Sequence, residues 1–393
     1  MASDALNRIG RAGTLKIVHV IVGLNVGGAE LMLKRLLETH AMLPGYEHSV
    51  ISLTDLGVIG AQLRAQGVSV RALGLRKLLG LPFAFLSLYK QLRQTRPDIV
   101  QTWMYHADLL GGLAARLAGV RHVIWGVRTT DIGKGGKRST MLVRSMCARL
   151  SNWLPNVIVC AAQASRQAHI DVGYAADRMV VIHNGFDLAK FQPDAIQRKQ
   201  LRLSLGIGDE ELVVGSLGRF NPVKDHANFI AAAAMVAQQL PHVRFLMVGR
   251  GLDEDNPVVV DLLAKGGVAR RFTCLGERQD VAACLNAMDV FCLHSRTEGF
   301  PNVLGEAMAM ALPCVTTDVG DARHLLSGNG VVVPAQDSTA LADGMLRLLA
   351  MDDAARKAIG QVAQARIGEC FTIASSAEKF KGVYDNLFGA KLR

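Results

Sequence analysis

The sequence is poor in aromatic residues, which make up 5% of its 393 residues, and its seven cysteines include no Cys-x-x-Cys pair. Several cysteines lie within apolar runs, which indicates buried, reduced thiols and therefore a cytoplasmic protein. The longest apolar stretch, residues 78–89, is much shorter than the roughly 20 residues that a membrane-spanning helix needs. The first residues are polar and basic and the apolar run at 17–24 is short, so we expect neither a secretory signal nor a spanning helix.

Acidic residues are scarce in the first half of the chain. Residues 1–190 contain 23 Lys and Arg against 11 Asp and Glu, whereas residues 191–393 contain 21 against 23. This asymmetry predicts an anionic partner for the N-terminal half. The chain lacks the alternation of aromatic and basic residues that single-strand binders use, and it has no zinc or helix-turn-helix pattern, which argues against nucleic acid. The acidic triplet at 253–255 has no histidine or further carboxylate near it in sequence, so we assign no metal site.

Two series of alternating strand and helix patterns predict an α/β fold. Buried strands are expected at 15–22, 48–53, 68–73, 99–103, 122–127 and 157–160, and again at 212–217, 245–248, 272–275, 290–293, 313–316 and 331–333. Helical patterns lie between them, and three helices are expected at 338–350, 353–370 and 374–388. Such alternation predicts a doubly wound parallel sheet in each half. We expect domains at 1–186 and 201–373, a polar linker at 187–200, and a C-terminal helix at 374–393.

The segment 298–314 is the most informative part of the sequence. Glu298 is expected in a loop before a helix and Glu306 inside that helix, with Pro301 in the first turn, where a missing N–H costs nothing. A helix start offers unpaired N–H groups and a partial positive charge, so it suits an anion. An anion site between two carboxylates fits a nucleotide-sugar, which has phosphates flanked by hydroxyls. The alternative is a buried helix with two solvated glutamates, but the Gly-Phe-Pro-Asn run at 299–302 favours a functional site.

Arg219 and Lys224 lie five residues apart in the loop that follows the expected strand at 212–217. Arginine can make a bidentate contact with a phosphate and lysine adds a point charge, so the pair suits a diphosphate. Taken alone, the same loop could be merely solvated, and its pairing with the 298–314 segment is what favours a site.

The N-terminal half offers weaker signals. Gly27 and Gly28 precede Glu30 in a turn after the first strand, where backbone N–H groups could approach a phosphate or a sugar, but many such turns need glycine for geometry alone. The spacing differs from the dinucleotide-binding pattern. His106 lies just past the strand at 99–103 and could hydrogen-bond a sugar hydroxyl, although a packing or capping role is the simpler reading.

These segments together resemble the family 4 retaining glycosyltransferases of the GT-B fold, of the bacterial polysaccharide and lipopolysaccharide type. The resemblance covers nearly the whole chain, from the Gly-Gly-Ala-Glu turn at 27–30 through 105–106, 181–187 and 218–224 to the two glutamates. It implies two Rossmann-like domains that face each other across a cleft, the first for the acceptor and the second for the nucleotide-sugar. It also implies that the last helix crosses back to the N-terminal domain.

The resemblance assigns roles to matching residues. Arg219 and Lys224 would hold the donor diphosphate, Glu306 would bind the ribose, and His106 would lie near the transferred sugar. Arg278 would line the nucleobase pocket. The donor sugar would contact Glu298 and the backbone of Gly299, Phe300, Pro301, Asn302 and Val303, and Gly27 and Gly28 would also contact the donor. The family often has glycine at the positions of Asp225 and Ala311 and proline at that of His183.

The implied activity is transfer of a hexose from a UDP- or GDP-sugar to a glycan or lipid-linked saccharide, in cell-surface polysaccharide biosynthesis. No nucleophile with a supporting base is evident, and the family's front-face mechanism needs neither that nor a metal or cofactor. Basic and apolar residues at 71–96 and 134–149 predict peripheral contact with an anionic membrane, at the inner face of the plasma membrane. The alternatives are a nucleotide-sugar epimerase on the same fold, a non-catalytic sugar-binding protein and a glycoside hydrolase.

Overall fold

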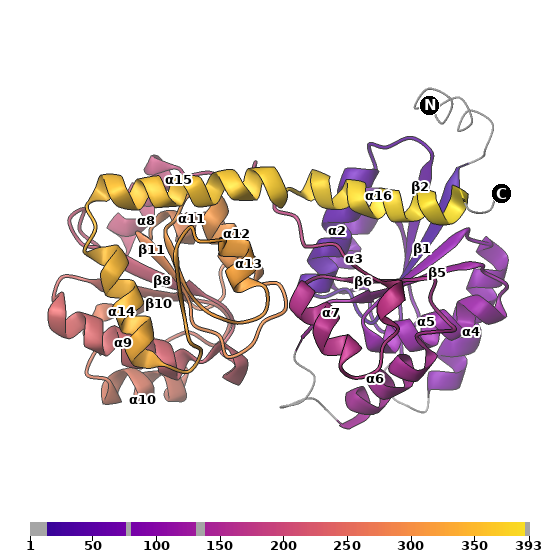
Figure 1. The fold of residues 1–393 in the computed structure, drawn as a ribbon, viewed down its shortest axis with the longest axis horizontal. Coiled ribbons are helices and arrows are strands. Elements are labelled where there is room, and N and C mark those ends of the chain that lie inside the picture. The colour runs from indigo at the N-terminus through magenta and orange to yellow at the C-terminus, as the bar shows by residue number, and fades with distance from the viewer. Residues whose placement is uncertain (1–13, 76–79, 131–137, 390–393) are drawn as a thin grey trace. The chain divides into compact units, whose positions relative to one another are not determined.

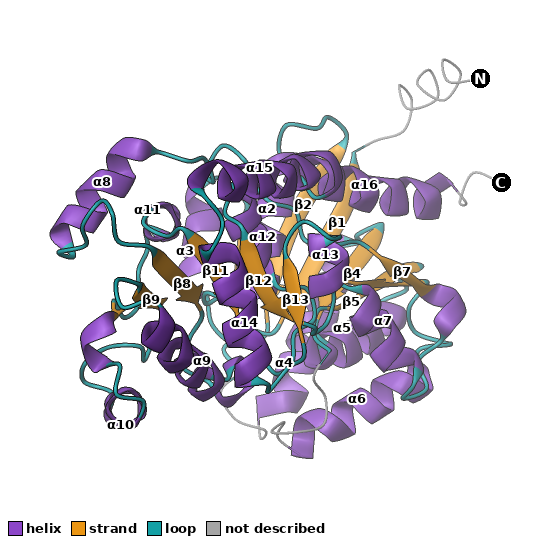
Figure 2. Cartoon of the chain, turned by 60° about the vertical axis from the view of Figure 1, so that its left-hand side comes forward, coloured by secondary structure: helices purple, strands orange, loops and turns teal. Residues whose placement is uncertain are grey.

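The computed structural model describes residues 14–75, 80–130 and 138–389. The chain divides into two compact units (Figure 1): unit 1 contains Met1–Gly185 and Ile373–Arg393, and unit 2 contains Phe186–Thr372. Each unit has one parallel sheet with helices packed around it (Figure 2). All seven cysteines are free and five of them are buried. Among the described helices, none is both long enough and apolar enough to span a membrane.

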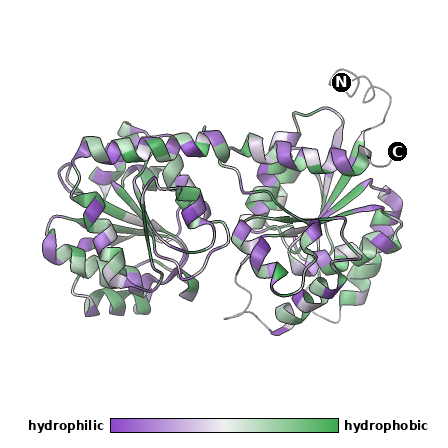
Figure 3. Ribbon diagram, viewed as in Figure 1, coloured by the Kyte–Doolittle hydropathy of each residue, from purple (hydrophilic) through white to green (hydrophobic). Residues whose placement is uncertain are grey.

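Unit 1 has a seven-stranded sheet in the order β3-β2-β1-β4-β5-β6-β7. The inner strands β1, β5 and β6 are mainly apolar and buried, as expected for a parallel sheet covered on both faces, and Figure 3 shows hydrophobic colours along the sheet, whereas β2 and β3 toward one edge carry more polar residues. The elements are β1 (Leu15–Ile21), α2 (Gly28–His40), β2 (Tyr46–Ser52), α3 (Gly57–Ala65), β3 (Ser69–Ala72), α4 (Leu81–Thr95), β4 (Ile99–Trp103), α5 (Tyr105–Leu117), β5 (His122–Val127), α6 (Arg138–Leu150), β6 (Val157–Cys160), α7 (Gln163–Ile170), η2 (Ala176–Arg178), β7 (Met179–Val181) and α16 (Ile373–Gly389).

Unit 2 has a six-stranded sheet in the order β10-β9-β8-β11-β12-β13. Its core is formed by Phe229, Phe245 and Phe272 and many aliphatic side chains between the sheet, α9 and α14. The elements are α8 (Ala195–Ser204), β8 (Val213–Leu217), η3 (Pro222–Lys224), α9 (His226–Gln239), β9 (Arg244–Val248), α10 (Pro257–Lys265), η4 (Ala269–Arg271), β10 (Phe272–Cys274), α11 (Val281–Asn286), β11 (Val290–Leu293), α12 (Asn302–Ala309), β12 (Cys314–Thr317), α13 (Ala322–Leu326), β13 (Val331–Val333), α14 (Ser338–Leu349) and α15 (Asp353–Cys370).

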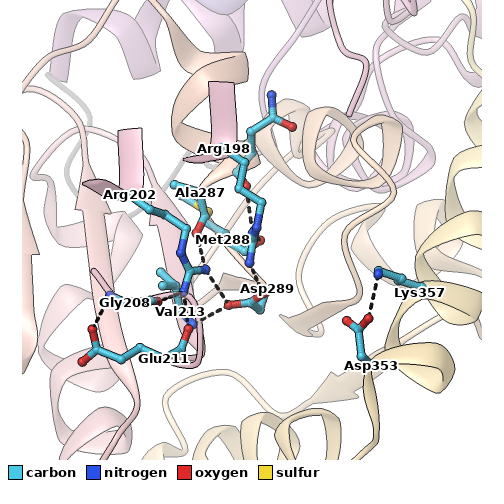
Figure 4. Close-up of polar contacts among 11 residues, drawn as sticks. Arg198, Arg202, Gly208, Glu211, Val213, Ala287, Met288, Asp289, Asp353 and Lys357 are labelled. Atoms are coloured by element: carbon cyan, nitrogen blue, oxygen red, sulfur yellow. Dashed lines mark hydrogen bonds and ion pairs between the residues drawn. The ribbon is translucent and has the colours of Figure 1, made fainter. Parts of the chain in front are cut away.

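The predicted linker at 187–200 is wrong, because these residues belong to unit 2 and the second half of the segment starts α8. Asp194 caps this helix by accepting hydrogen bonds from the N–H groups of Ile196 and Gln197. Arg198 and Arg202 then bind the carboxylate of Asp289, which directly precedes β11 (Figure 4). The polar residues that suggested a solvated linker therefore anchor a helix to the sheet.

Unit 2 begins and ends at adjacent points. Phe186 donates its N–H to the carbonyl of Phe371 and forms a parallel bridge with Thr372. The chain therefore leaves unit 2 beside its point of entry, and α16 follows as part of unit 1, where Phe380 and Tyr384 join the core beside α2 (Figure 1).

A chain of three histidines, of which His19 and His40 are buried and His48 is half-buried, ties α16 to the sheet of unit 1. The Trp103 Nε1–H donates to His19 Nδ1 (3.2 Å), and the remaining bonds join His19 to His48 (2.9 Å), His48 to His40 (3.2 Å) and His40 to the carbonyl of Ala377 (3.0 Å). Because Trp103 can only donate and a carbonyl can only accept, each histidine must be neutral with its proton on Nε2.

Candidate functional site

The carboxyl ends of β8 and β11 lie side by side at the point where the strand order of unit 2 reverses. From β8 the chain continues outward through β9 and β10, whereas β11 leads the other way to β12 and β13. Ligands of open parallel sheets bind in the crevice outside such a reversal. Two of the predicted segments follow these two strands, since Arg219 and Lys224 come after β8 and Glu298 after β11.

Lys224 and Glu298 are brought into direct contact. The Lys224 Nζ atom lies 2.5 Å from Glu298 Oε1, and the Ser295 hydroxyl donates to the same oxygen at 2.6 Å. Both ionised side chains are largely buried, with exposed fractions of 20% and 14%. The arrangement neutralises two charges that would be costly to bury singly. We call Lys224, Glu298 and Ser295 the Lys–Glu cluster.

A buried histidine holds the backbone of the Lys–Glu cluster in place. His294 directly follows β11, and its Nδ1–H donates to the carbonyl of Lys224 (2.5 Å) while its Nε2 accepts from the Ser216 hydroxyl (2.6 Å). Burial, reinforced by the nearby His226, lowers the pKa of His294 well below its ordinary value. The neutral ring therefore fixes the backbone that carries Lys224.

Asp225 stands at a position where the family often has glycine, and its backbone conformation shows why glycine suits that position. Its φ angle is +57°, in the left-handed region that favours glycine. Aspartate tolerates this region better than most residues, and here its buried carboxylate accepts a hydrogen bond from Arg296 at 2.8 Å. Ala311, the second departure, also has a positive φ, of 55°. Both departures thus occur where the backbone favours glycine, and neither removes a polar group from the Lys–Glu cluster.

The start of α12 lies in the loop that carries Glu298. Pro301 is the N-cap residue, with no side-chain capping hydrogen bond, and Asn302 is the first helical residue. The prediction of Pro301 within the first turn is therefore wrong by one position. The loop is held by the N–H of Asp321, which donates to Gly299 O at 2.9 Å. A Cβ at the neighbouring Gly320, where φ is +53°, would overlap Gly299 O, so this close approach requires glycine.

The side chain of Phe300 packs in the core. It is 6% exposed and stacks on Phe186 with ring centroids 6.0 Å apart. The Phe186 ring also lies directly against Gly305 of α12, where any side chain would overlap it. Packing of this kind fixes α12, and so it positions the helix start and Glu306, which is half-buried within the helix.

The remaining predicted residues of unit 2 lie nearby or further along the sheet. Arg219 is exposed and makes no side-chain hydrogen bond or ion pair within the described residues. Arg278 follows β10, two strands away from β8, and its guanidinium binds Asp280 at 2.6 and 2.8 Å. The structure therefore does not bring Arg278 into contact with the Lys–Glu cluster.

The candidate residues of unit 1 occupy the corresponding reversal, between β1 and β4. Gly27 is the extended N-cap of α2 and Gly28 its first residue. His106 lies half-buried in the first turn of α5, and burial lowers its pKa. The preceding Met104 has a φ of +74°, an unfavourable conformation for a methionine, and its N–H donates to Gly126 O. Residues in unfavourable backbone conformations cluster at active and ligand-binding sites.

Sequence reasoning missed Ser295, His294 and Arg296, which form most of the hydrogen bonds around Lys224, Glu298 and Asp225. The signal that could have found them is their place directly after β11, because residues there line the crevice of a parallel sheet. In the part of the chain that the structure describes, no group of three or more His, Cys, Asp or Glu is arranged to hold a metal ion.

A cavity of about 430 Å³ in unit 2 lies at the amino ends of β11 and β12, opposite the carboxyl ends that carry the Lys–Glu cluster. Asp289 and Pro313, which precede β11 and β12, line it together with residues of α8 and α15, among them Arg198 and Lys357 (Figure 4). Its charged groups are largely paired with one another: Arg198 with Asp289 and Lys357 with Asp353. The cavity is therefore separate from the Lys–Glu cluster.

Comparisons with known proteins bear on the family and the fold of the chain. The model of Glycosyltransferase Family 4 matches residues 26–190, and that of Glycosyl transferases group 1 matches residues 211–351. A UDP-Gal:alpha-D-GlcNAc-diphosphoundecaprenol alpha-1,3-galactosyltransferase of Escherichia coli is 28% identical over 77% of this chain and 78% of its own length. A lipopolysaccharide core biosynthesis mannosyltransferase of Rhizobium meliloti is 29% identical over 58% of this chain and 65% of its own length.

Among solved structures, Anabaena HepE in complex with UDP has a TM-score of 0.83 and 23% identity, over 95% of this chain and 100% of that one. At that identity the likeness concerns the fold. The alternatives of an epimerase, a sugar-binding protein or a glycoside hydrolase gain no support from these comparisons.

Proposed function

We propose that this chain, which belongs to the family 4 glycosyltransferases and has the GT-B fold, transfers a hexose with retention from a nucleotide-diphosphate donor to a lipid-linked saccharide or another glycan. The observation that carries the proposal is the Lys–Glu cluster at the strand reversal of unit 2, next to the uncapped start of α12. The relatives' names, which concern lipid-diphosphate and lipopolysaccharide saccharides, support a role in cell-surface polysaccharide biosynthesis.

The donor diphosphate would bind between Arg219 and Lys224. Arg219 has its guanidinium free of described partners, and Lys224 uses one of its three N–H groups on Glu298. Glu298 Oε1 already accepts from two groups, so Oε2 is left to accept from a hydroxyl of the donor sugar. Glu306 would bind the ribose hydroxyls, and the E. coli relative and Anabaena HepE, which concern UDP-Gal and UDP, favour a uridine donor.

The chemistry would be front-face substitution. The acceptor oxygen forms a bond to the anomeric carbon as the bond from that carbon to the diphosphate oxygen breaks, and the departing phosphate takes the acceptor proton. Arg219, Lys224 and the partial positive charge at the start of α12 stabilise the leaving diphosphate. Burial favours a neutral His106, which suits a hydrogen bond to a sugar hydroxyl. Because these groups carry the positive charge, activity should persist in EDTA, and a loss restored by Mn²⁺ would contradict this mechanism.

Unit 1 would act at the inner face of the plasma membrane, in the cytoplasm. On α4, Phe83 and Leu86 are 75% and 51% exposed, and on α6 Leu142 is 64% exposed. Phe85 and Val143, which we also predicted at this surface, pack against the core instead. The predicted residues Arg76, Lys77, Leu78, Leu79, Lys134 and Lys137 lie outside the described residues. Co-sedimentation with phosphatidylglycerol vesicles should be strong at low salt and weak at high salt, and equal binding to neutral vesicles would contradict the proposal.

The transfer assay that tests this function supplies radiolabelled UDP- or GDP-sugars with a lipid-diphosphate saccharide and follows label in the lipid fraction. Transfer to the acceptor supports the proposal. Incubation without acceptor is the control, because a new nucleotide-sugar formed there would identify an epimerase. Thermal shift against UDP and GDP selects the base, since a ligand at 100 times its Kd stabilises by about 2.7 kcal/mol.

A further inference from the structure

The segment that leads into α5 contains a backbone conformation that only glycine adopts easily. Met104, the N-cap residue of α5, has a φ of +74° and a ψ of 156°. This combination is almost entirely confined to glycine, because the side chain of any other residue is crowded there. Such a conformation persists only where the surrounding structure holds it. The contacts that hold Met104 therefore bear on the function of the residues beside it.

Asp108 is a fully buried acid in the first turn of α5, and it has no role in the proposed transfer so far. Its Oδ1 atom accepts hydrogen bonds from the Thr102 hydroxyl at 2.5 Å and from the Gly126 N–H at 3.3 Å. Its Oδ2 atom is shielded from solvent and has no hydrogen-bond partner. Among the described residues no lysine or arginine forms an ion pair with it. A buried acid without a cation is uncommon, because burial of an unpaired charge is costly.

Asp108 and Met104 belong to one ring of hydrogen bonds, which lies just past the last registered pair of β4 and β5, Gln101 with Ile124. The Met104 N–H donates to the Gly126 carbonyl at 2.8 Å, and the Gly126 N–H donates to the Asp108 carboxyl group. The Asp108 N–H closes the ring by donating to the Met104 carbonyl at 2.9 Å. Asp108 therefore holds the strained residue both directly and through the end of β5.

His106 lies in the chain between Met104 and Asp108, so the same ring fixes the backbone on both sides of it. The side chain of His106 is half-buried, and this burial lowers its pKa. The neighbouring Tyr105 is anchored as well, because its hydroxyl donates to His169 Nε2 of α7 at 2.7 Å. The position of His106 is therefore set by a turn that Asp108 helps to hold.

We propose that Asp108 is a positioning residue, which holds the first turn of α5 against the strain at Met104 and so keeps His106 in place at the transferred sugar. The part played by His106 at the sugar rests on the proposed transferase function, whereas the hold of Asp108 on the turn does not. The role requires an oxygen that accepts from Gly126 and Thr102. Burial raises the pKa of Asp108 to about 7, and both the charged and the protonated form offer that oxygen, so asparagine should replace it.

A measurement of the pKa of His106 by NMR tests the positioning without any need for catalysis, with the signal assigned by its absence from His106→Gln. Asp108→Ala should loosen the turn, expose His106 and raise its pKa toward the ordinary value. Loss of a nearby carboxylate would by itself lower the pKa of a histidine, so a rise reports exposure. Asp108→Asn should keep the low pKa. Asp171→Ala, which removes an exposed aspartate of the same unit, should keep it too.

The transfer assay tests whether this positioning serves the reaction. Asp108→Ala should lower kcat by about 10- to 100-fold, because a small displacement of a positioned group costs that much. The KM for the nucleotide-sugar should stay within about twofold, since unit 2 binds the donor, and Asp108→Asn should keep kcat near the wild-type value. In a His106→Ala background, Asp108→Ala should cause no further loss, because changes that act through one side chain are not additive.

Three results would overturn the inference. An unchanged pKa of His106 in folded Asp108→Ala would show that Asp108 does not hold the turn, and Thr102→Val, which removes only one donor to it, should give a smaller rise if Asp108→Ala does not fold. Equal losses of kcat in Asp108→Ala and Asp108→Asn would exclude the acceptor role. Additive losses with His106→Ala would show that Asp108 acts elsewhere. By contrast, the expected rise in pKa in a protein that transfers sugar to no acceptor would contradict the proposed function and leave the positioning intact.

Discussion

Unit 1 and unit 2 share an architecture but differ in how far their charged side chains are paired. Each has a parallel sheet whose order reverses between two neighbouring strands, with candidate residues after both. In unit 2 four charged side chains at the reversal are paired, Lys224 with Glu298 and Arg296 with Asp225, and only the exposed Arg219 has no partner there among the described residues. The unit has 18 Lys and Arg against 22 Asp and Glu. Unit 1 has a large basic excess, and its buried Arg128 has no acidic partner among the described residues.

The difference concerns how each unit stabilises its buried charges. A paired lysine in unit 2 is stable before the ligand binds and can share its remaining N–H groups with a diphosphate. In unit 1 the guanidinium of Arg128 has no such partner among the described residues, so its burial costs free energy that other contacts of the unit must offset. The following changes should each affect one unit and leave the other as it is.

Lys224→Ala and Arg219→Ala should have the largest effect. Their charges stabilise the leaving diphosphate, so loss of either should lower kcat by roughly 10²-fold or more, by analogy with removal of an oxyanion-stabilising group. Steady-state kinetics with saturating donor measures this. Lys357→Ala is the control, since it removes an exposed lysine of unit 2 that pairs with Asp353 at the cavity separate from the Lys–Glu cluster. Near-normal kcat in both variants would refute the diphosphate assignment.

Glu306→Ala should weaken nucleotide binding while leaving kcat nearly unchanged. A ribose contact exists in the ground state and in the transition state, so its loss raises the donor KM. A charge-assisted hydrogen bond contributes about 1.5–3 kcal/mol, or about 10- to 150-fold in Kd. Calorimetric titration with the free nucleoside diphosphate checks this directly. Unchanged affinity would show that Glu306 does not bind ribose.

Gly305→Ala should destabilise unit 2 by about 1–3 kcal/mol, because the new methyl group overlaps the buried Phe186 ring. Gly382→Ala is the matched control in a helix of unit 1, where a Cβ meets nothing within 4 Å. That change should stabilise by about 0.5–1 kcal/mol, since alanine favours helix. Urea unfolding followed by circular dichroism gives both values, and a stable Gly305→Ala protein would mean that α12 can shift away from Phe186.

The sequence predicted individual strands better than it predicted their neighbours. β4, β5, β6, β11 and β13 have the expected bounds, because each is a short buried run flanked by turn residues. The edge strand β7 has only three residues and gave no comparable signal. Contact between Lys224 and Glu298, 74 residues apart, depends on β8 lying beside β11, and alternation of strands and helices does not specify strand order.

The sequence pattern also did not predict the backbone conformation of individual residues or the burial of charged side chains. The positive φ of Asp225 is visible only once the chain turns from η3 into α9. Arg202 and Arg128 look like surface residues in sequence, yet Arg202 is 2% exposed and anchors α8, while the guanidinium of Arg128 is largely shielded within unit 1. Burial of these arginines follows from tertiary packing, which periodicity does not report.

Mild acid should produce the smallest effect, and in unit 1 it should act through the chain of histidines between Trp103 and Ala377. Burial lowers the pKa of His48 to about 3 and that of His19 well below its ordinary value. The unfolded chain, with pKa values near 6.5, therefore binds protons that the folded chain refuses, so stability is full above about pH 7 and falls as the pH drops toward 3. Between pH 7 and 6 each of these residues should cost about 0.7 kcal/mol, half the limiting slope of about 1.4 kcal/mol per pH unit.

Geometry supports the same direction, because a proton on any histidine of the chain between Trp103 and Ala377 would oppose two N–H donors. The groups facing His40 from α16 are Glu378, Lys381 and Asp385, whose charges partly oppose one another. Urea unfolding followed by tryptophan fluorescence reports unit 1 alone. His48→Gln should flatten the pH dependence, whereas His242→Gln, an exposed histidine of unit 2, should not. Equal pH dependence in wild type and His48→Gln would show that the histidine chain opens and takes up protons without loss of the fold.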